Sequence, residues 1–134
     1  MDNTTLTRSY ARNGYYDPVK NRTNLQLLIG WRVNEITFNR NTKHATGVIM
    51  QERNAQGDSG KATLRARKEV ILTAGSLHSP QILQRSGVGP APLLKQAGIN
   101  LLVDLPGVGS NLQDHPVGRI SFQRTSGCSG VPPQ

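Results

Sequence analysis

Residues 67–89, RKEVILTAGSLHSPQILQRSGVG, constrain the fold of this chain more than any other stretch. A charged lead-in gives way to the apolar run 70–72, which small residues follow. This order is typical of a strand buried on both faces of a parallel sheet. Ser79 and Pro80 have the chemistry of a helix N-cap and a first helical residue, and Gly87 that of a helix end. The stretch therefore predicts a strand, a small-residue loop and a short helix.

The loop at the carboxyl end of this predicted strand consists of Thr73, Ala74 and Gly75. Ligands of open α/β sheets lie outside the carboxyl ends of the strands, where small side chains let the backbone come close to them. A tight strand-to-helix connection, in which Gly75 supplies only backbone freedom, explains the same residues. The local pattern leaves both interpretations open.

Residues 75–89 resemble the second signature of the glucose-methanol-choline oxidoreductases, which are flavoproteins. The Gly-Ser pair, the Ser-Pro, the two aliphatic residues and the Ser-Gly-aliphatic-Gly of that signature are all present at matching spacing. The resemblance favours a cofactor contact at the strand end, and it implies that Ala74 and Gly75 pack against the adenine side of FAD.

The positive charge of the chain raises the hypothesis of a nucleic-acid function. The net charge is +8 and the pI is near 10.4, and basic domains of this kind are candidates for nucleic-acid binding. However, the 16 Lys and Arg residues are scattered, and the aromatic residues that would stack on bases make up only 4%. We expect no nucleic-acid partner, and a small basic binding module without enzymatic activity is the alternative function.

Length and cysteine content narrow the class of protein further. A chain of 134 residues is at most one domain. The single cysteine, Cys128, excludes an internal disulfide and a cysteine-based metal site, so we expect no metal. No apolar run approaches the length of a membrane-spanning helix, so we expect no membrane partner.

Three segments before residue 67 are predicted to form an antiparallel meander. Residues 31–38, 46–51 and 61–66 carry apolar residues in strand-like patterns, and turn-forming residues join them. Residues 24–29 are a further candidate strand. The resemblance implies the same meander, because flavoproteins of this family carry a three-stranded antiparallel piece between strands of the dinucleotide-binding sheet.

The resemblance also gives Val33 a role. Its position in the family's apolar strand implies that its backbone amide and carbonyl pair with the adenine of FAD. The alternative is that Val33 is simply an inward-facing residue of its strand.

The sequence after the signature follows the same family. A second short helix that Gly98 ends is predicted, and then a strand over residues 99–103. Residues 104–115 resemble a family stretch, which implies that Asn111, Asp114 and His115 lie near the cofactor or the substrate entrance. This assignment is weaker than the one for Val33, Ala74 and Gly75. His115 is not assigned a catalytic role, because no nucleophile or second base accompanies it.

These observations predict an α/β fold, namely a partial FAD-binding, Rossmann-like domain with an antiparallel meander, within a larger flavoprotein fold. We expect a polar lead-in segment over residues 1–23, the partial FAD-binding domain over 24–118 and a polar, Gly/Pro-rich tail over 119–134.

The expected function is that of an internal fragment of an FAD-dependent oxidoreductase, which acts on the CH–OH group of a small alcohol. The family's phosphate-binding Gly-x-Gly-x-x-Gly and its active-site histidine have no counterpart in the sequence. We therefore assign no catalytic residue, and expect the isolated chain to be inactive. A non-functional truncated remnant is a further alternative.

Overall fold

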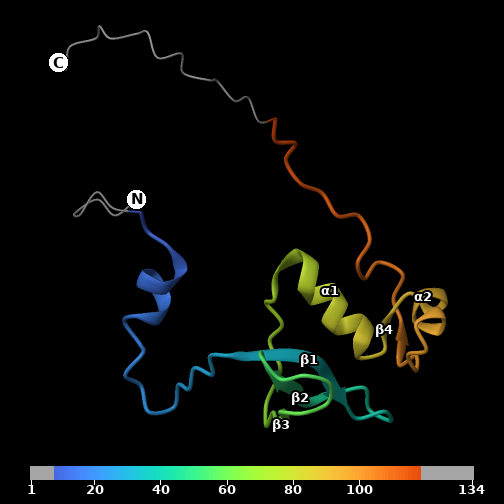
Figure 1. Cartoon of the computed structure of the whole chain (residues 1–134), viewed down its shortest axis with the longest axis horizontal. Coiled ribbons are helices and arrows are strands. Elements are labelled where there is room, and N and C mark those ends of the chain that lie inside the picture. Colours follow the sequence, from blue (N-terminus) through green and yellow to red (C-terminus); the bar gives the residue numbers. More distant parts are fainter. Residues whose placement is uncertain (1–7, 119–134) are drawn as a thin grey trace, which may run out of the picture.

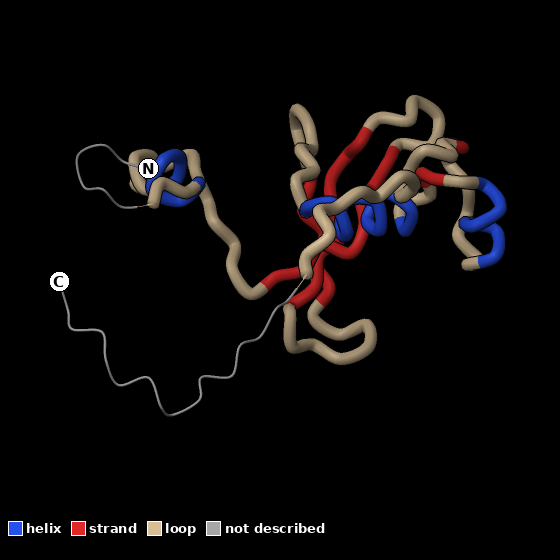
Figure 2. Tube along the Cα trace, turned by 90° about the horizontal axis from the view of Figure 1, so that it is seen from above, coloured by secondary structure: helices blue, strands red, loops and turns tan. Residues whose placement is uncertain are grey.

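The computed structural model describes residues 8–118. Figure 1 shows helix α1 lying over the strands, with the short second helix beyond its end and an N-terminal helical segment apart from both. Figure 2 shows, from above, the extended stretch that joins this N-terminal segment to the first strand. The elements in chain order are η1 (Arg12–Tyr16, a π-helix), β1 (Trp31–Phe38), β2 (Ala45–Glu52), β3 (Lys61–Arg65), α1 (Gly75–Arg85), β4 (Val88–Gly89), α2 (Ala91–Gln96) and β5 (Val103–Asp104). No helix within residues 8–118 is long and apolar enough to cross a membrane.

The predicted meander is confirmed. Strands β1, β2 and β3 form one antiparallel sheet in that order. Val33 of β1 lies opposite Met50 of β2, and Ile36 lies opposite Val48. The register shifts between Val33 and Glu35, so that one extra residue of β1 is accommodated by a bulge. The bulge lies beside Val33, where the strand passes α1.

A small apolar core lies where α1 meets β1 and the segment after it. Its buried apolar residues are Ile36, Ile82, Val88 and Leu94, and Leu94 is only 1% exposed. Leu94 belongs to α2, which begins after Pro90 as predicted. The core is small beside the number of large apolar side chains that remain exposed in the described residues.

Two predicted strands are not present. Residues 70–72 lie in an irregular segment, and Ile71 is 75% exposed. Residues 24–29 also form no strand, and Ile29 is 81% exposed. The physical reason is that a strand forms only where a neighbouring strand supplies backbone hydrogen bonds, and no described residue pairs with either segment.

Helix α1 begins earlier than predicted. Ser79 is not its N-cap, because Ala74 precedes the first helical residue, Gly75, and Pro80 lies inside the helix. The prediction for the other end is confirmed: Gly87 follows the C-cap with a φ of +88°. A Cβ at Gly87 would also lie 2.6 Å from the carbonyl oxygen of Asn100, so this position requires glycine.

The strand predicted over residues 99–103 is confirmed only at its end. Strand β5 comprises Val103–Asp104 and pairs in parallel with β4. The Asp104 carboxylate accepts a hydrogen bond from the backbone N–H of Ala91 at 2.9 Å. This bond ties β5 to the first turn of α2.

Candidate cofactor site

A hollow of about 420 Å³ lies between β1 and α1. It brings together Val33 and Ala74, two residues for which the sequence predicts a cofactor contact. Gly75 adjoins Ala74 as the first residue of α1 but does not line the hollow. The lining residues are Arg32, Val33, Ala74, His78, Gln81, Ile82 and Arg85.

The local backbone leaves Val33 and Ala74 open to the same hollow. Val33 precedes the bulge of β1 and remains 37% exposed, so it is neither buried in the sheet nor covered by α1. Gly75 starts α1 with a φ of +85°, a conformation that glycine adopts without strain. A Cβ added at Gly75 would meet no atom within 4 Å, so the space beside it is open.

The ionisable side chains that line this hollow are basic or imidazole groups. Arg32 and Arg85 flank it, His78 projects from the first half of α1, and none of the lining residues carries a carboxylate. Guanidinium groups favour planar or anionic partners such as aromatic rings, carboxylates and phosphates. The composition of the hollow therefore suits an anionic ligand with an aromatic part.

Arg32 is held in place by a buried polar network that the sequence did not reveal. Its Nε donates to Oδ1 of Asn34 at 3.3 Å, and its Nη2 donates to Oε1 of Gln51 at 3.4 Å. Asn34 and Gln51 are 5% and 3% exposed. Gln51 Nε2 also donates to the carbonyl oxygens of Gly57 and Ser59 at 2.6 and 2.9 Å. The only signal in the sequence was a polar residue, Asn34, between the apolar positions of its strand.

A second hollow, of about 720 Å³, lies between α1 and the loop over residues 108–113. Gln84 of α1 ties the loop to the helix, because its Nε2 donates to the carbonyl oxygen of Val108 at 3.1 Å. Asn111 lines this hollow with a φ of +56°, and it shares the hollow with the hydroxyls of Ser76 and Ser79. The lining residues carry no charge, so this hollow suits a neutral ligand group with hydroxyls.

Asp114 and His115 line neither of these two hollows. Both are exposed, and the Asp114 carboxylate accepts a hydrogen bond from the backbone N–H of His115 at 2.7 Å. The carboxylate thus contacts the backbone of its neighbour. Of the three weaker candidates from the sequence, only Asn111 lines one of these two hollows.

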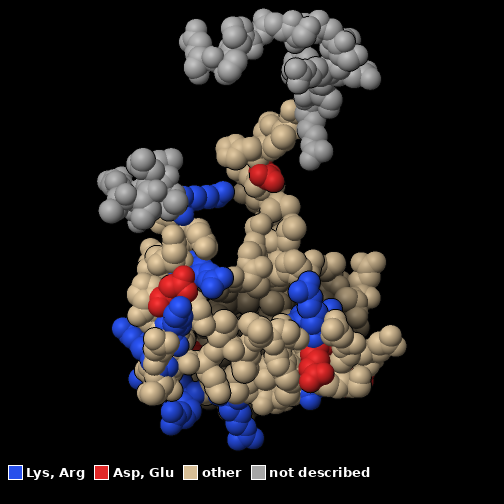
Figure 3. Space-filling model, turned by 60° about the vertical axis from the view of Figure 1, so that its left-hand side comes forward, with Lys and Arg blue, Asp and Glu red and all other residues tan. Residues whose placement is uncertain are grey.

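The basic side chains do not gather into one surface in the view of Figure 3. Lys and Arg are spread over several parts of the face shown there, with Asp and Glu between some of them. A continuous basic surface is the electrostatic footprint of nucleic-acid binding. This distribution gives no support to the alternative of a basic binding module.

Comparisons with known proteins identify the family of the chain. A family model described as GMC oxidoreductase matches residues 1–117. The GMC oxidoreductase family protein Mala s 12 of Malassezia sympodialis is 47% identical over 92% of this chain. Choline oxidase of Arthrobacter globiformis is 40% identical over 87% of it. The chain spans about a fifth of the length of these relatives, namely 20% and 21%.

The solved structures that resemble this chain are also oxidoreductases. An FAD-dependent oxidoreductase from Chaetomium thermophilum superposes with a TM-score of 0.72 at 41% identity, over 80% of this chain and 18% of that one. A fungal aryl-alcohol oxidase superposes with a TM-score of 0.71 at 40% identity, over 80% of this chain and 17% of that one. These neighbours confirm the predicted fold class, a partial α/β, Rossmann-like domain with an antiparallel meander.

Proposed function

The chain belongs to the GMC oxidoreductase family, and on this premise we propose that its β1–α1 hollow binds the adenosine part of FAD. The complete protein would be an oxidoreductase that acts on the CH–OH group of a small alcohol. The observation that supports this proposal best is that Val33 and Ala74, which are far apart in the sequence, line one hollow.

The residues of the hollow fit this part of the cofactor. Its volume of about 420 Å³ falls within the usual range of small-molecule sites. Val33, Ala74 and Ile82 offer apolar contact for a flat base, while Arg32 and Arg85 offer positive charge to an anionic dinucleotide. The open space beside Gly75 lets a ligand approach the backbone at the start of α1.

The roles of this chain's residues are binding and orientation. The chemistry that bound FAD supplies is the two-electron oxidation of the alcohol. Val33, Ala74 and Gly75 would hold the adenosine part through packing and backbone contacts. Asn111, in the second hollow, would border the cofactor or the substrate entrance, and Asp114 and His115 would lie further along the same loop. None of these residues is proposed as a catalytic acid or base.

A ligand titration of the 134-residue chain, followed by amide NMR spectra, tests the adenosine site. FAD and AMP should shift the amide signals of Val33, Ala74 and Gly75, whereas FMN, which lacks adenosine, should leave them unchanged. Equal shifts with FMN, or no shifts with FAD and AMP, would contradict the proposal. We expect the affinity to be weak, because the sequence contains no glycine-rich loop to hold the phosphates at a helix N-terminus.

Two matched glycine variants separate binding from folding. Gly75 and Gly98 both have a positive φ, and a Cβ at either would meet no atom within 4 Å. Valine should therefore strain the backbone at both positions. Only Gly75→Val should weaken FAD binding, because Gly75 adjoins Ala74 in the wall of the β1–α1 hollow, whereas Gly98 follows α2, which lines neither of the two hollows. An equal loss of FAD binding in both variants would mean that Gly75 serves the helix start alone.

A further inference from the structure

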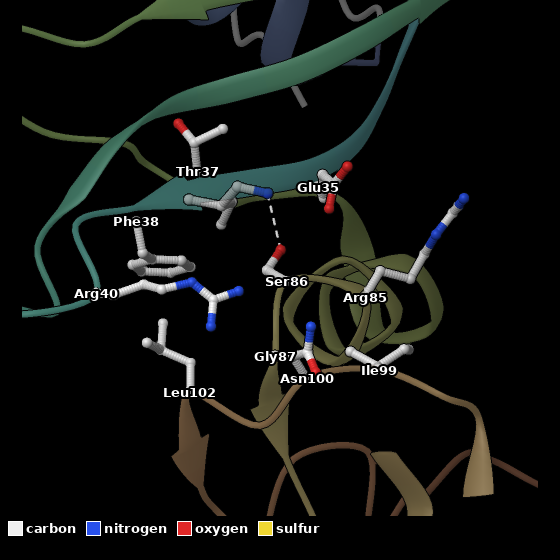
Figure 4. Close-up of a pocket in the computed structure, with 11 residues that line it drawn as sticks. Glu35, Thr37, Phe38, Arg40, Arg85, Ser86, Gly87, Ile99, Asn100 and Leu102 are labelled. Carbon is white, nitrogen blue, oxygen red and sulfur yellow. Dashed lines mark hydrogen bonds between the residues drawn. The ribbon is translucent and has the colours of Figure 1, made fainter. Parts of the chain in front are cut away.

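The side chain of Ser86 joins the end of α1 to the backbone of β1. Its Oγ accepts a hydrogen bond from the N–H of Ile36 at 2.8 Å and donates one to the carbonyl oxygen of Ile82 at 2.6 Å. Figure 4 draws the first of these bonds as a dashed line between the strand and Ser86. Because Ile36 and Ser86 are 50 positions apart, the bond is a tertiary link between strand and helix.

The position of β1 in the sheet explains why this link is needed. Among the described residues, β1 is an edge strand that pairs with β2 alone, so one side of its backbone has no strand partner there. Ile36 is only 7% exposed, and a buried N–H without an acceptor is costly. Ser86 supplies that acceptor. Within residues 8–118, no other hydrogen bond joins β1 to α1 or to its C-cap.

The same link sets the walls of the β1–α1 hollow. Ile36 lies three residues after Val33 on β1. Ile82, whose carbonyl oxygen accepts the hydrogen bond from Ser86, lines the hollow from α1. A change in the separation of Ile36 and Ser86 would therefore shift α1 against β1, and would move Ile82 and Arg85 relative to Val33. Because a hydrogen bond is directional, it adds to packing a constraint on the position of α1 against β1.

We propose that Ser86 is a positioning residue for the adenosine site, a role that rests on the proposed function. Its hydroxyl holds β1 and α1 at the spacing at which Val33 and Ala74 contact the ligand together. Ser86 itself lies outside the lining of this hollow and so acts through the two elements that it joins. Arg85, the residue before it, lines the hollow and is placed by the same helix end.

The test compares Ser86→Ala with Ser86→Thr, which keeps a hydroxyl at the same position. In the alanine variant, the Ile36 amide should exchange with solvent at least about tenfold faster, and FAD should bind about tenfold more weakly, which corresponds to about 1.4 kcal/mol. The threonine variant should stay within about twofold of the wild-type affinity on the same reasoning. This rescue distinguishes the hydroxyl from the volume of the side chain.

Two control variants test whether a loss of stability, or the loss of a hydroxyl elsewhere in the chain, weakens FAD binding by itself. Val88→Ala destabilises the core at a buried residue that does not line the hollow, so it should lower the melting temperature without weakening FAD binding. Thr46→Val removes an exposed hydroxyl that donates to the carbonyl oxygen of Thr37 at 3.1 Å, at the end of the β1–β2 pair away from Val33. Its FAD affinity should equal that of the wild type.

The possible failures are distinguishable. If FAD and AMP leave the Val33 and Ala74 signals of the wild type unchanged, the adenosine site itself is wrong, and the role of Ser86 fails with it. If the wild type binds FAD and Ser86→Ala binds it equally well, only the role of Ser86 is overturned. Should the alanine variant not fold, Ser86→Cys takes its place, because a thiol is a weaker acceptor. A wild-type affinity in that variant would also overturn the role.

Discussion

The meander and the two apolar segments that flank it differ in one physical respect, which is where their hydrogen-bond partners lie. The meander spans β1 to β3, and each strand pairs with the next one along the chain. Residues 24–29 precede it and residues 70–72 follow it, and both carry strand-like apolar sequences without forming strands. Among these segments, a strand-like pattern forms a strand only where a turn brings the partner alongside.

This difference also separates the two parts of the candidate site. Val33 comes from the meander, and its surroundings are fixed by pairing with β2 and by the link from Ser86 to Ile36. Ala74 comes from the end of the irregular segment, and it is placed only because α1 begins directly after it. The β1 side of the hollow is thus held by strand pairing and by a hydrogen bond. The side at Ala74 depends on where α1 begins.

Gly47→Val should break the meander at one close approach between two strands, with a large loss of stability. A Cβ at Gly47 would collide with the carbonyl oxygen of Leu64 and would lie 3.0 Å from the Cα of Arg65 on the neighbouring strand. Strands β2 and β3 would have to separate, at a cost of about 3 kcal/mol or more. A thermal melt followed by circular dichroism measures this loss.

Thr63→Val is the matched control for that variant. It introduces the same apolar valine at an exposed position of β3, opposite Ile49 of β2, where a side chain of the same shape is already present. Its melting temperature should stay close to that of the wild type. A similar loss in both variants would show that the meander is sensitive to any added apolar side chain rather than to the close approach at Gly47.

The sequence predicted those parts of the fold in which local chemistry decides the outcome. Alternation and turn residues predicted the meander, and Gly87 predicted the end of α1, because each depends on residues near it in the chain. The start of α1 was wrong because Pro80 was interpreted as a first helical residue, whereas the structure tolerates it inside the helix. The parallel strand at residues 70–72 was wrong because its partners would be distant in sequence.

The candidate site also has features that the sequence predicts and features that depend on contacts between residues distant in sequence. The family signature pointed to Ala74, Gly75 and Val33, and the structure brings Val33 and Ala74 into one hollow. No pattern in the sequence could indicate that Gln51 holds Arg32 through a buried network, since that network joins residues across the sheet. The boundaries at residues 24 and 118, and the cofactor roles of all six candidates, stay predictions.

Ile71→Lys should leave the stability of the chain nearly unchanged while reducing its self-association. Ile71 is 75% exposed, so lysine removes no buried contact, and the change in the free energy of unfolding should stay within about 0.5 kcal/mol. Exposed apolar segments favour association between copies, and a charge weakens it. Sedimentation velocity measures the association, and a thermal melt measures the stability.

The contrasting variant is Ile36→Lys, which places the same charge in the core beside α1, where Ile36 is 7% exposed. It should prevent folding, because a buried charge without a partner is strongly unfavourable. Equal melting temperatures for the Ile36 and Ile71 variants would contradict the assignment of one segment to the core and the other to the exposed surface.

The smallest effect that we expect concerns the turn that joins β2 to β3. The irregular segment over residues 66–74 has no such turn to bring a neighbouring strand alongside it. Lys61 Nζ lies 2.6 Å from Oδ1 of Asp58, and this hydrogen bond and charge lower the pKa of Asp58 below its ordinary value. A carboxyl whose pKa is lowered by folding contributes stability above its unfolded-state pKa, and this contribution is lost as the pH falls through the folded-state pKa.

Asp58→Asn should therefore lower the melting temperature slightly at pH 7 and not at all at a pH well below the ordinary range of aspartate. Because Asp58 is 92% exposed, water screens the pair and the difference should be close to the limit of measurement. A loss that persisted unchanged in acid would mean that the side chain supports the turn through its shape rather than its charge.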